Sequence, residues 1–393
     1  MKESILNTEI QEFINSNLNS DITSLLLKGT NFPTLETKDI IEQIEAKKRS
    51  EKKLPTWFHA KSIYYPNKLN IEQTSSEITA QFKSGLISGE SIIDLTGGFG
   101  VDCYYFSKVF ESVFHCEINE SLSEIVNHNY KQLNINNIIT KKIDGIEFLK
   151  SATNTFDWIY IDPSRRHESK GKVFFLNDCL PNIPEHLELL FKHSKNILIK
   201  TSPLLDLSVG IGELKYVKTI HIVAVNNEVK ELLWVLEYGF KSDISIKTIN
   251  IKQDSNEYFS FLAEAEKKSE SKLSKPLTYL YEPNSAILKA GAFDAISNEL
   301  NLYKLHKHSH LYTSEALIEF PGRRFKIQNI LPYNKKELKN LDINKANITT
   351  RNFPETVEQL RKKFEIKDGG NNYLFFTTDL NENKIVIIST KKD

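Results

Sequence analysis

The stretch Asp94-Leu95-Thr96-Gly97-Gly98-Phe99-Gly100-Val101-Asp102 decides the fold of this chain. It follows a predicted strand and opens a predicted helix, so the glycines form the turn between them. Glycines let the backbone approach a ligand closely, and the start of a helix offers free N–H groups. A dinucleotide-binding loop would need a further glycine at position 103, which is Cys103. The loop therefore favours a ligand without a pyrophosphate.

Around this loop, short runs rich in β-branched and aromatic residues alternate with longer helix-like stretches from about residue 76 onward. Such alternation is typical of βαβ units, in which a parallel sheet carries helices on both faces. The predicted strands are residues 91–95, 112–117, 138–143, 158–161, 196–200, 217–225 and 231–238.

The last two of these strands are joined only by the short turn Asn226-Asn227-Glu228. A parallel pair needs a crossover of roughly a dozen residues or more, so this pair must be antiparallel. The sequence thus predicts an α/β, Rossmann-like, seven-stranded domain that ends in an antiparallel hairpin. Two further strands are predicted at 244–251 and 258–263, followed by a polar linker at 264–275 and a mixed α+β region.

Carboxylates stand where three successive predicted strands end, and ligands of such sheets bind at the carboxyl ends of the strands. Glu117 is placed to accept hydrogen bonds from both hydroxyls of a ribose, and Asp144 to meet an adenine amino group. S-adenosylmethionine suits these acids, because it has no phosphate and carries a cationic sulfonium. The predicted cofactor-binding residues are Asp94, Thr96, Gly97, Gly98, Gly100, Asp102, Glu117 and Asp144.

The fourth predicted strand ends in Asp162-Pro163-Ser164-Arg165-Arg166-His167, where the acceptor of a methyl group is expected to lie. Pro163 stiffens the turn, and Asp162 can orient an acceptor nitrogen or take its proton. Arg165 and Arg166 can hold phosphate through bidentate hydrogen bonds. A plain strand-to-loop turn with solvated arginines is the alternative. We predict Asp162, Pro163, Ser164 and Arg165 as catalytic residues, and residues 168–172 as a segment that closes over the substrate.

In their order these motifs resemble those of class I methyltransferases, over about residues 76–240. The turn at Asp162 is also similar to the Asp-Pro-Pro-Arg turn of RNA uracil-C5 methyltransferases, with Ser164 in place of the second proline. That family uses a cysteine at the end of the next strand, whereas this strand ends in Lys200-Thr201-Ser202-Pro203. A hydroxyl is a poor nucleophile without a base, so methylation of a base nitrogen is the preferred prediction.

The C-terminal region resembles a segment that follows the catalytic domain in bacterial THUMP-like methyltransferases. The resemblance rests on the stretches 281–287, 289–292, 346–354, 360–363, 369–370 and 374–377. It implies a small ferredoxin-like piece before a THUMP-like domain, and THUMP domains handle structured RNA. The predicted domains are an N-terminal helical region at 1–60, the methyltransferase domain at 61–272, a ferredoxin-like α+β domain at 276–325 and a basic THUMP-like domain at 326–393.

The charge of the chain is unevenly distributed. The formal net charge is zero, but residues 321–393 contain 15 Lys and Arg against 9 Asp and Glu, a net charge of +6. A basic tail on an acidic body favours a polyanionic partner such as tRNA or rRNA. A solvated helix end is the alternative for Arg361 and Lys362. The predicted RNA-binding residues are Arg166, Arg323, Arg324, Arg351, Arg361 and Lys362.

The composition argues against several other classes of protein. The sequence shows neither a run of about 18 apolar residues nor a secretory signal, which predicts no membrane partner. Three cysteines without a Cys-x-x-Cys pair argue against a disulfide framework and favour a cytoplasmic location. His306, His308 and His310 alternate, which on a strand would place them on one face. Further ligands are not evident in the sequence, so no metal is predicted.

The sequence therefore predicts an S-adenosylmethionine-dependent methyltransferase that N-methylates a base in structured RNA (tRNA or rRNA). Two alternatives stay open. One is a small-molecule or protein methyltransferase whose tail is a lid or a dimer surface. The other is a non-catalytic RNA-binding protein on a methyltransferase scaffold.

Overall fold

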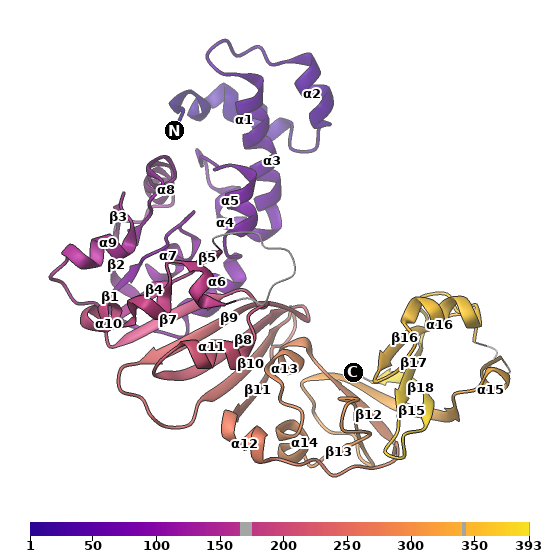
Figure 1. Ribbon diagram of the computed structural model, residues 1–393. Coiled ribbons are helices and arrows are strands. Elements are labelled where there is room, and N and C mark those ends of the chain that lie inside the picture. Colours follow the sequence, from indigo (N-terminus) through magenta and orange to yellow (C-terminus); the bar gives the residue numbers. More distant parts are fainter. Residues whose placement is uncertain (166–174, 340–342, 393) are drawn as a thin grey trace. The chain divides into compact units, whose positions relative to one another are not determined.

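The computed structural model describes residues 1–165, 175–339 and 343–392 (Figure 1). The chain divides into two compact units. The first contains Met1–Val217 and Leu233–Lys241, and the second contains Lys218–Leu232 and Ser242–Asp393. The predicted acidic site lies wholly in the first unit, and the basic region lies wholly in the second.

Short helices form the start of the first unit. The longest, α3, buries Ile40, Ile41 and Ile44, and it also buries Lys47 of the lysine-rich run near its end. Helices α4 and α5 pack beside α3 (Figure 1). The elements are η1 (Glu3–Leu6), α1 (Thr8–Ser16), α2 (Ile22–Lys28), α3 (Thr37–Lys53), α4 (Pro55–His59), α5 (Lys68–Gln73) and α6 (Glu77–Ser84).

A nine-stranded sheet follows, in the order β11-β10-β8-β9-β7-β4-β1-β2-β3. The pairs β1–β2, β1–β4, β2–β3, β4–β7 and β8–β10 are parallel, whereas β10–β11 is antiparallel. The strands are β1 (Gly89–Asp94), β2 (Phe110–Cys116), β3 (Ile138–Lys141), β4 (Trp158–Ile161), β7 (Asn196–Thr201), β8 (Val217–Val225), β9 (Glu228–Glu237), β10 (Ser245–Ile251) and β11 (Glu257–Leu262).

The predicted α/β fold is confirmed, and the sheet is wider than predicted. Asn226 and Asn227 both have positive φ, 50° and 64°, as a type I′ hairpin turn requires, so β8 and β9 form the expected hairpin. The two further strands predicted after residue 243 extend the same sheet, whose core order is that of class I methyltransferases. Two short strands, β5 (Ser164–Arg165) and β6 (Cys179–Leu180), pair separately.

Amphipathic helices connect the strands of the first unit. In α8 the residues Leu122, Ile125, Val126 and Tyr130 are buried, at the i, i+3, i+4 and i+8 spacing of one helix face. The helices are α7 (Val101–Phe106), α8 (Glu120–Gln132), α9 (Gly145–Ser151), η2 (Leu176–Asp178), α10 (Ile183–His193) and α11 (Leu207–Glu213).

The second unit contains a seven-stranded sheet in the order β13-β14-β12-β15-β18-β17-β16. Its long strand β15 pairs with β12 on one side and with β18 on the other. The strands are β12 (Tyr279–Pro283), β13 (Tyr303–Lys304), β14 (Tyr312–Ser314), β15 (Gly322–Pro332), β16 (Asn347–Arg351), β17 (Asn372–Thr378) and β18 (Lys384–Lys392). The helices are α12 (Ala263–Lys268), α13 (Ser285–Ala290), α14 (Ala295–Glu299), α15 (Lys335–Lys339) and α16 (Val357–Phe364).

One expectation for this region was wrong. The polar stretch 264–275 is not all linker, since α12 occupies part of it, and its Glu266 accepts hydrogen bonds from the N–H groups of Phe293, Asp294 and Ala295. The alternating histidines lie in a turn. His306 bonds to Glu382, with 2.8 Å between Nε2 and Oε1, whereas His310 stacks on Phe293.

Candidate functional site

The glycine-rich loop between β1 and α7 has little room for side chains. Gly98 and Gly100 have φ of +55° and +79°, a left-handed conformation that favours glycine. A Cβ on Gly97 would lie 2.3 Å from Nε2 of the buried His115, and one on Gly100 would lie 2.1 Å from Oη of Tyr130. The tight loop thus depends on all three predicted glycines.

Asp94 lies beneath this loop and is almost fully buried, with 2% of its surface exposed. Its Oδ1 accepts hydrogen bonds from the Thr96 N–H at 2.8 Å and from the Thr96 hydroxyl at 3.2 Å. Burial raises the pKa of Asp94 to about 7, and the nearby Asp102 adds to the increase. Asp94 therefore shapes the loop from below, and its ionisation state changes near neutral pH.

Glu117 follows β2 and turns its carboxylate toward the same loop. Its Oε2 accepts the Gly98 N–H at 2.9 Å, and its Oε1 accepts the Asn119 N–H at 2.8 Å. Each carboxylate oxygen has two lone pairs, so one remains on each oxygen for a ligand. A pinned carboxylate with two parallel acceptor sites matches a pair of neighbouring hydroxyl groups.

Asp144 caps helix α9 after β3. Its Oδ1 accepts the N–H groups of Ile146 at 2.8 Å and Glu147 at 3.0 Å. A Cβ on the next residue, Gly145, would lie 2.4 Å from the carbonyl oxygen of Leu95, so the start of α9 packs directly on the glycine-rich loop. The structure thus brings Asp144 close to the backbone that follows Asp94.

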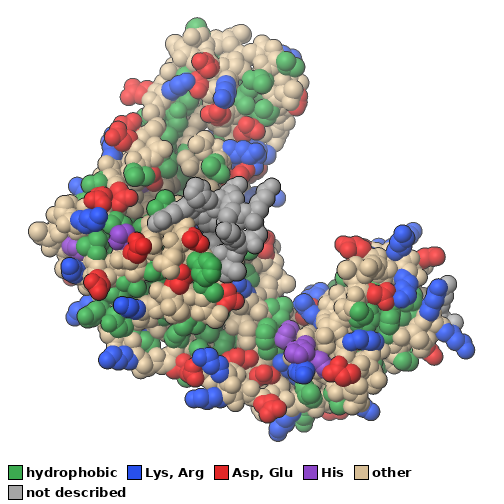
Figure 2. Space-filling view, in the orientation of Figure 1, with side chains coloured by type: hydrophobic (Ala, Val, Ile, Leu, Met, Phe, Trp, Pro, Cys, Tyr) green, Lys and Arg blue, Asp and Glu red, His purple; other side chains and the backbone are tan. Residues whose placement is uncertain are grey.

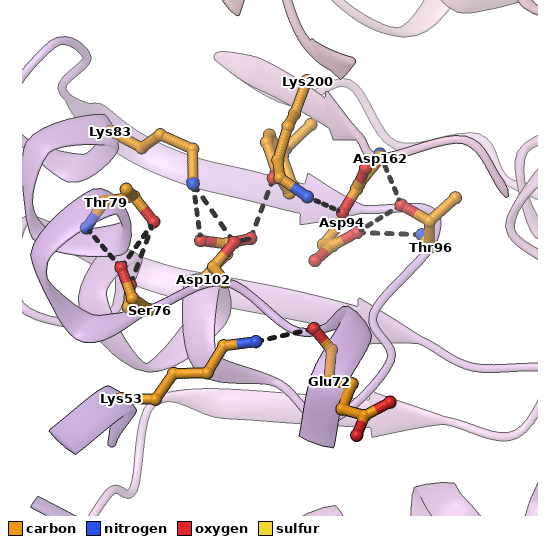
Figure 3. Close-up of polar contacts among 12 residues, drawn as sticks. Lys53, Glu72, Ser76, Thr79, Lys83, Asp94, Thr96, Asp102, Asp162 and Lys200 are labelled. Atoms are coloured by element: carbon orange, nitrogen blue, oxygen red, sulfur yellow. Dashed lines mark hydrogen bonds and ion pairs between the residues drawn. The ribbon is translucent and has the colours of Figure 1, made fainter. Parts of the chain in front are cut away.

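The Asp162 turn is joined to the glycine-rich loop by a direct hydrogen bond. The Asp162 N–H donates to Oγ1 of Thr96 at 2.7 Å. The Asp162 carboxylate forms an ion pair with the ammonium of Lys200, which extends from the end of β7 (Figure 3). Thr96 therefore contacts both Asp94 and Asp162, and it links the predicted cofactor site to the predicted acceptor site.

Asp102 faces the interior of the first unit. Its Oδ2 accepts hydrogen bonds from the hydroxyls of Ser75 and Tyr160, both at 2.8 Å, and Lys83 Nζ lies 3.3 Å from its Oδ1 (Figure 3). Burial opposes ionisation of Asp102, but the ammoniums of Lys83 and Lys200 outweigh it and lower its pKa. These contacts favour a structural role for Asp102 rather than direct contact with a cofactor.

The rest of the predicted acceptor turn is only partly described. Pro163 is buried and Ser164 is exposed, and Ser164 begins strand β5, which pairs with β6. Of Arg165 the structure describes the backbone only. Arg166, His167 and the segment 168–172 lie outside the described residues, so their predicted roles stay predictions.

Two lysines of this site were not predicted from the sequence. Lys200 holds Asp162, and Lys83 of α6 holds Asp102. Lys200 could have been found, because it ends the strand that adjoins β4 and stands on the same edge as Asp162. Lys83 could not, because no pattern in the chain links a helix before β1 to the start of α7.

The predicted RNA-binding arginines of the second unit are held by carboxylates. Arg323 donates from Nε to Oε2 of the buried Glu282 at 2.6 Å, and Arg351 donates from Nη2 to Oε1 of the same residue at 2.9 Å. Arg324 pairs with Glu319. One carboxylate thus holds two guanidinium groups, which leaves a local excess of positive charge.

The last two predicted RNA-binding residues lie on α16. Arg361 pairs with Asp368 and also donates to the carbonyls of Ala346 and Ile366. Lys362 is exposed. Figure 2 shows Lys and Arg side chains over the part of the chain that contains α15 and α16.

A pocket of about 540 Å³ in the second unit adjoins the Glu282 cluster. Both Arg323 and Arg351 line it, together with Lys391 and Ser285. Within the described part of the chain, two buried polar atoms of this pocket have no hydrogen-bond partner, Nε of Arg351 and Oγ of Ser285. The pocket therefore offers unused hydrogen-bonding groups, and its charged lining residues are Lys252, Arg323, Arg351 and Lys391 against Asp254, Glu257 and Glu282.

In residues 1–165, 175–339 and 343–392 no helix is long and apolar enough to cross a membrane. The same residues contain no group of three or more His, Cys, Asp or Glu side chains placed to hold a metal ion. The three cysteines are buried and free.

Two family models match the second unit, one described as a ferredoxin-like domain at residues 279–321 and one as THUMP domain-like at residues 322–391. None of the curated proteins matches the chain.

The order of the strands in the nine-stranded sheet is that of the class I methyltransferase fold. A crystal structure from Porphyromonas gingivalis W83, named as a "putative methyltransferase", is 32% identical, with a TM-score of 0.91 over 100% of this chain and 99% of the other. The chain belongs to the family of this protein, methyltransferases with C-terminal ferredoxin-like and THUMP-like domains.

Other solved structures match only part of the chain. An rRNA methylase from Streptococcus thermophilus is 15% identical, with a TM-score of 0.31, over 41% of this chain and 93% of the other. TrmK from M. capricolum, in complex with S-adenosylhomocysteine, is 16% identical, with a TM-score of 0.34, over 42% of this chain and 70% of the other.

Proposed function

We propose that this chain uses S-adenosylmethionine to methylate a nitrogen atom on a base of structured RNA, tRNA or rRNA, in the cytoplasm. The observation that carries the proposal is the Thr96 hydroxyl, which accepts the Asp162 N–H at 2.7 Å while it bonds to Asp94. A loop suited to a cofactor and a turn suited to an acceptor thus share one residue.

The residues present fit S-adenosylmethionine. The two outward lone pairs of Glu117 suit the ribose hydroxyls, and Asp144 suits the adenine amino group. The backbone of Gly97 and Gly98 allows close approach, because a Cβ on Gly98 would find only the Thr96 carbonyl, at 3.7 Å. S-adenosylmethionine, when bound, supplies an electrophilic methyl group. In this proposal Asp102 does not contact the cofactor. It accepts hydrogen bonds from Ser75 and Tyr160, which fix the start of α7.

Asp162 is the proposed catalytic residue. Lys200 holds its Oδ2, and no described residue donates a hydrogen bond to its Oδ1. That oxygen can accept a hydrogen bond from an acceptor N–H and take its proton. Methyl transfer mainly requires alignment of the reacting atoms, and positioning can contribute roughly 7–11 kcal/mol. A carboxylate held in place by Lys200 and by its own backbone supplies such positioning.

The second unit supports RNA as the substrate class. It contains the THUMP domain-like match, a net charge of +6 over residues 321–393, and arginines that outnumber the carboxylate holding them. Guanidinium groups with unused N–H donors suit phosphate oxygens. RNA with folded structure presents many such phosphates to a basic surface.

The test combines activity with identification of the product. RNA from cells that lack this protein is incubated with the full chain and with S-adenosylmethionine that carries a labelled methyl group. We expect label in RNA, and nucleoside mass spectrometry then identifies an N-methylated base that is present in wild-type cells and missing in the deletion strain. The Asp162→Asn variant should bind S-adenosylmethionine normally and transfer no label.

Other outcomes would contradict parts of the proposal. Label in protein or in small molecules, but not in RNA, would show that the substrate is not RNA. Failure of the full chain to bind S-adenosylmethionine in calorimetry would favour a non-catalytic RNA-binding protein. Unchanged transfer by Asp162→Asn would refute the catalytic assignment alone.

A further inference from the structure

A second pocket, of about 500 Å³, lies among the N-terminal helices of the first unit. Residues of α1, α3, α4 and the chain up to Ser62 line it, and it shares no lining residue with the cofactor site described above. Pockets that bind small molecules commonly have volumes of about 300–1,000 Å³. The size therefore suits a ligand larger than a single ion.

The most unusual residue of this pocket is Lys47 of α3. It is only 7% exposed, and it forms no hydrogen bond or ion pair with any residue of the described chain. Its ammonium lies 5.6 Å from the centre of the Phe58 ring. By contrast, the adjacent Lys48 pairs with Glu51 at 2.8 Å. Most of the Lys47 side chain is buried, while its Nζ is not among the fully buried polar atoms without a partner in the described chain, so the ammonium can be reached by a ligand. A largely desolvated ammonium without a counter-ion favours an anion in the pocket.

The other charged groups of the pocket add to this preference. Lys61 and His59 also line it, and Glu12 is its one acidic lining residue among those described. Burial lowers the pKa of Lys47, as expected for an ammonium that lacks a partner. Lysine is a common ligand of phosphate, which it holds as a point charge.

The pocket also has large apolar lining residues, the half-buried Phe58 together with Leu6 and Leu18. Its other uncharged lining residues are Thr8, Gln11, Asn15, Ala60 and Ser62. An aromatic or apolar surface beside a cationic group matches the two parts of a nucleotide, since bases stack on aromatic rings while phosphates meet lysines. We propose that this pocket binds a nucleotide, with its phosphate at Lys47 and its base against the side formed by Phe58 and the two leucines.

The nucleotide could be free or part of an RNA chain, and the second source rests on the proposed function. The test is calorimetry on the full chain with uridine 5′-monophosphate, uridine and a short oligouridylate. Saturating S-adenosylhomocysteine is present, so that the cofactor site is filled. The variants are Lys47→Met, Lys47→Arg and, as a matched control on the same helix, Lys48→Met.

We expect uridine 5′-monophosphate or the oligomer to bind and uridine to bind at least about tenfold more weakly. Lys47→Met should weaken binding by about tenfold or more, whereas Lys47→Arg and Lys48→Met should stay within a few-fold of the wild type. Lys47→Met should also fold, with an unchanged or higher Tm, because it removes an unpaired buried charge and keeps the side-chain length. Binding of both phosphorylated ligands indicates a free nucleotide, and binding of the oligomer alone indicates RNA.

Two results would overturn the proposal. One is the absence of binding for every phosphorylated ligand, and the other is equal affinity of Lys47→Met and the wild type. Methyl transfer to RNA, measured on the same proteins, separates the two hypotheses. If nucleotide binding does not depend on Lys47 while methyl transfer to RNA occurs, only the nucleotide-binding proposal is refuted. If nucleotide binding depends on Lys47 but no methyl group is transferred to RNA, only the proposed function is refuted.

Discussion

At the scale of single residues, Asp94 has the clearest pH-dependent consequence. Burial raises its pKa from 3.8 to about 7, so the folded chain keeps this proton to a higher pH than the unfolded chain does. Between these two values the folded state binds more protons, and the contribution of Asp94 to the free energy of unfolding falls as the pH rises. The limit is about 1.4 kcal/mol for each pH unit.

Asp94→Asn should therefore remove this decrease. Denaturant unfolding of wild type and variant at several pH values between about 4 and about 7 should show the variant gaining relative stability as the pH rises. Asp254→Asn, at an exposed carboxylate, is the control. A constant difference between Asp94→Asn and the wild type across this range would disprove the ionisation that we assign to Asp94.

Lys200 gives a second test at this scale. In our proposal it orients the Asp162 carboxylate without touching the cofactor. Lys200→Met should lower kcat by about a hundredfold, as a misplaced catalytic group does, while the Kd for S-adenosylmethionine stays unchanged. Timed methyl-transfer assays measure kcat, and calorimetry measures the Kd. A variant that loses cofactor affinity instead would place Lys200 in the cofactor site.

The sequence predicts these residues unevenly. Asp94, Glu117, Asp144 and Asp162 could be proposed because each lies at or shortly after the end of a strand, and parallel strands bring their carboxyl ends to one edge. The sequence places Asp102 in the first turn of α7, but it does not show which way the carboxylate faces. That direction depends on Lys83 and Tyr160, which are distant in sequence and close only after folding.

At the scale of elements, Asp144 has two separable roles. As the N-cap of α9 it accepts two backbone N–H groups through one oxygen, and the other oxygen is the proposed adenine contact. Asp144→Ser keeps a capping oxygen, so its free energy of unfolding should stay close to that of the wild type. Asp144→Ala should lose about 1 kcal/mol.

Both Asp144 variants should bind S-adenosylmethionine more weakly than the wild type does. Denaturation and calorimetry on the same three proteins distinguish the roles. If Asp144→Ser binds the cofactor as the wild type does, then Asp144 is a helix cap and nothing more.

Strand and helix patterns explain why most elements of the first unit could be predicted. Strand β4 and strand β8 begin and end where the sequence indicates, since buried β-branched runs are bounded by polar turns. The alternate histidines at 306–310 did not indicate an element or a role, and the structure places them in a turn. His306 is buried because it meets Glu382 and Asn352, which are contacts from distant parts of the second unit.

At the scale of the whole molecule, RNA binding should depend on salt in a residue-specific way. Lys362 and Lys192 are both exposed lysines in the last turn of a helix, α16 and α10 respectively. Lys362→Gln should weaken RNA binding and reduce the slope of log affinity against log salt by about 1, whereas Lys192→Gln should leave both unchanged. Fluorescence anisotropy over a salt series measures both, and equal slopes for the two variants would remove α16 from the RNA-binding surface.

The fold class of the molecule could be predicted from the sequence, but the pairing of every strand could not. The alternation of strands and helices indicated the α/β sheet, and the turn at Asn226 indicated its β8–β9 hairpin. The attachment of β10 and β11 to the same sheet was not predictable, because a run of residues shows that a strand forms but not which strand it pairs with. The predicted domain limits at 272 and 325 remain predictions.

Strand β15 begins at Gly322, where the two C-terminal family segments meet, and it pairs with a strand of each segment. Arg324, Phe325 and Lys326 are hydrogen-bonded on one side to β12 and on the other to β18. A hinge needs a few residues whose backbone is free to rotate, and rotation here would break ladders on both sides at once. The ferredoxin-like and THUMP-like segments should consequently melt as one cooperative body, and neither should survive excision at residue 322 as an independently folding module.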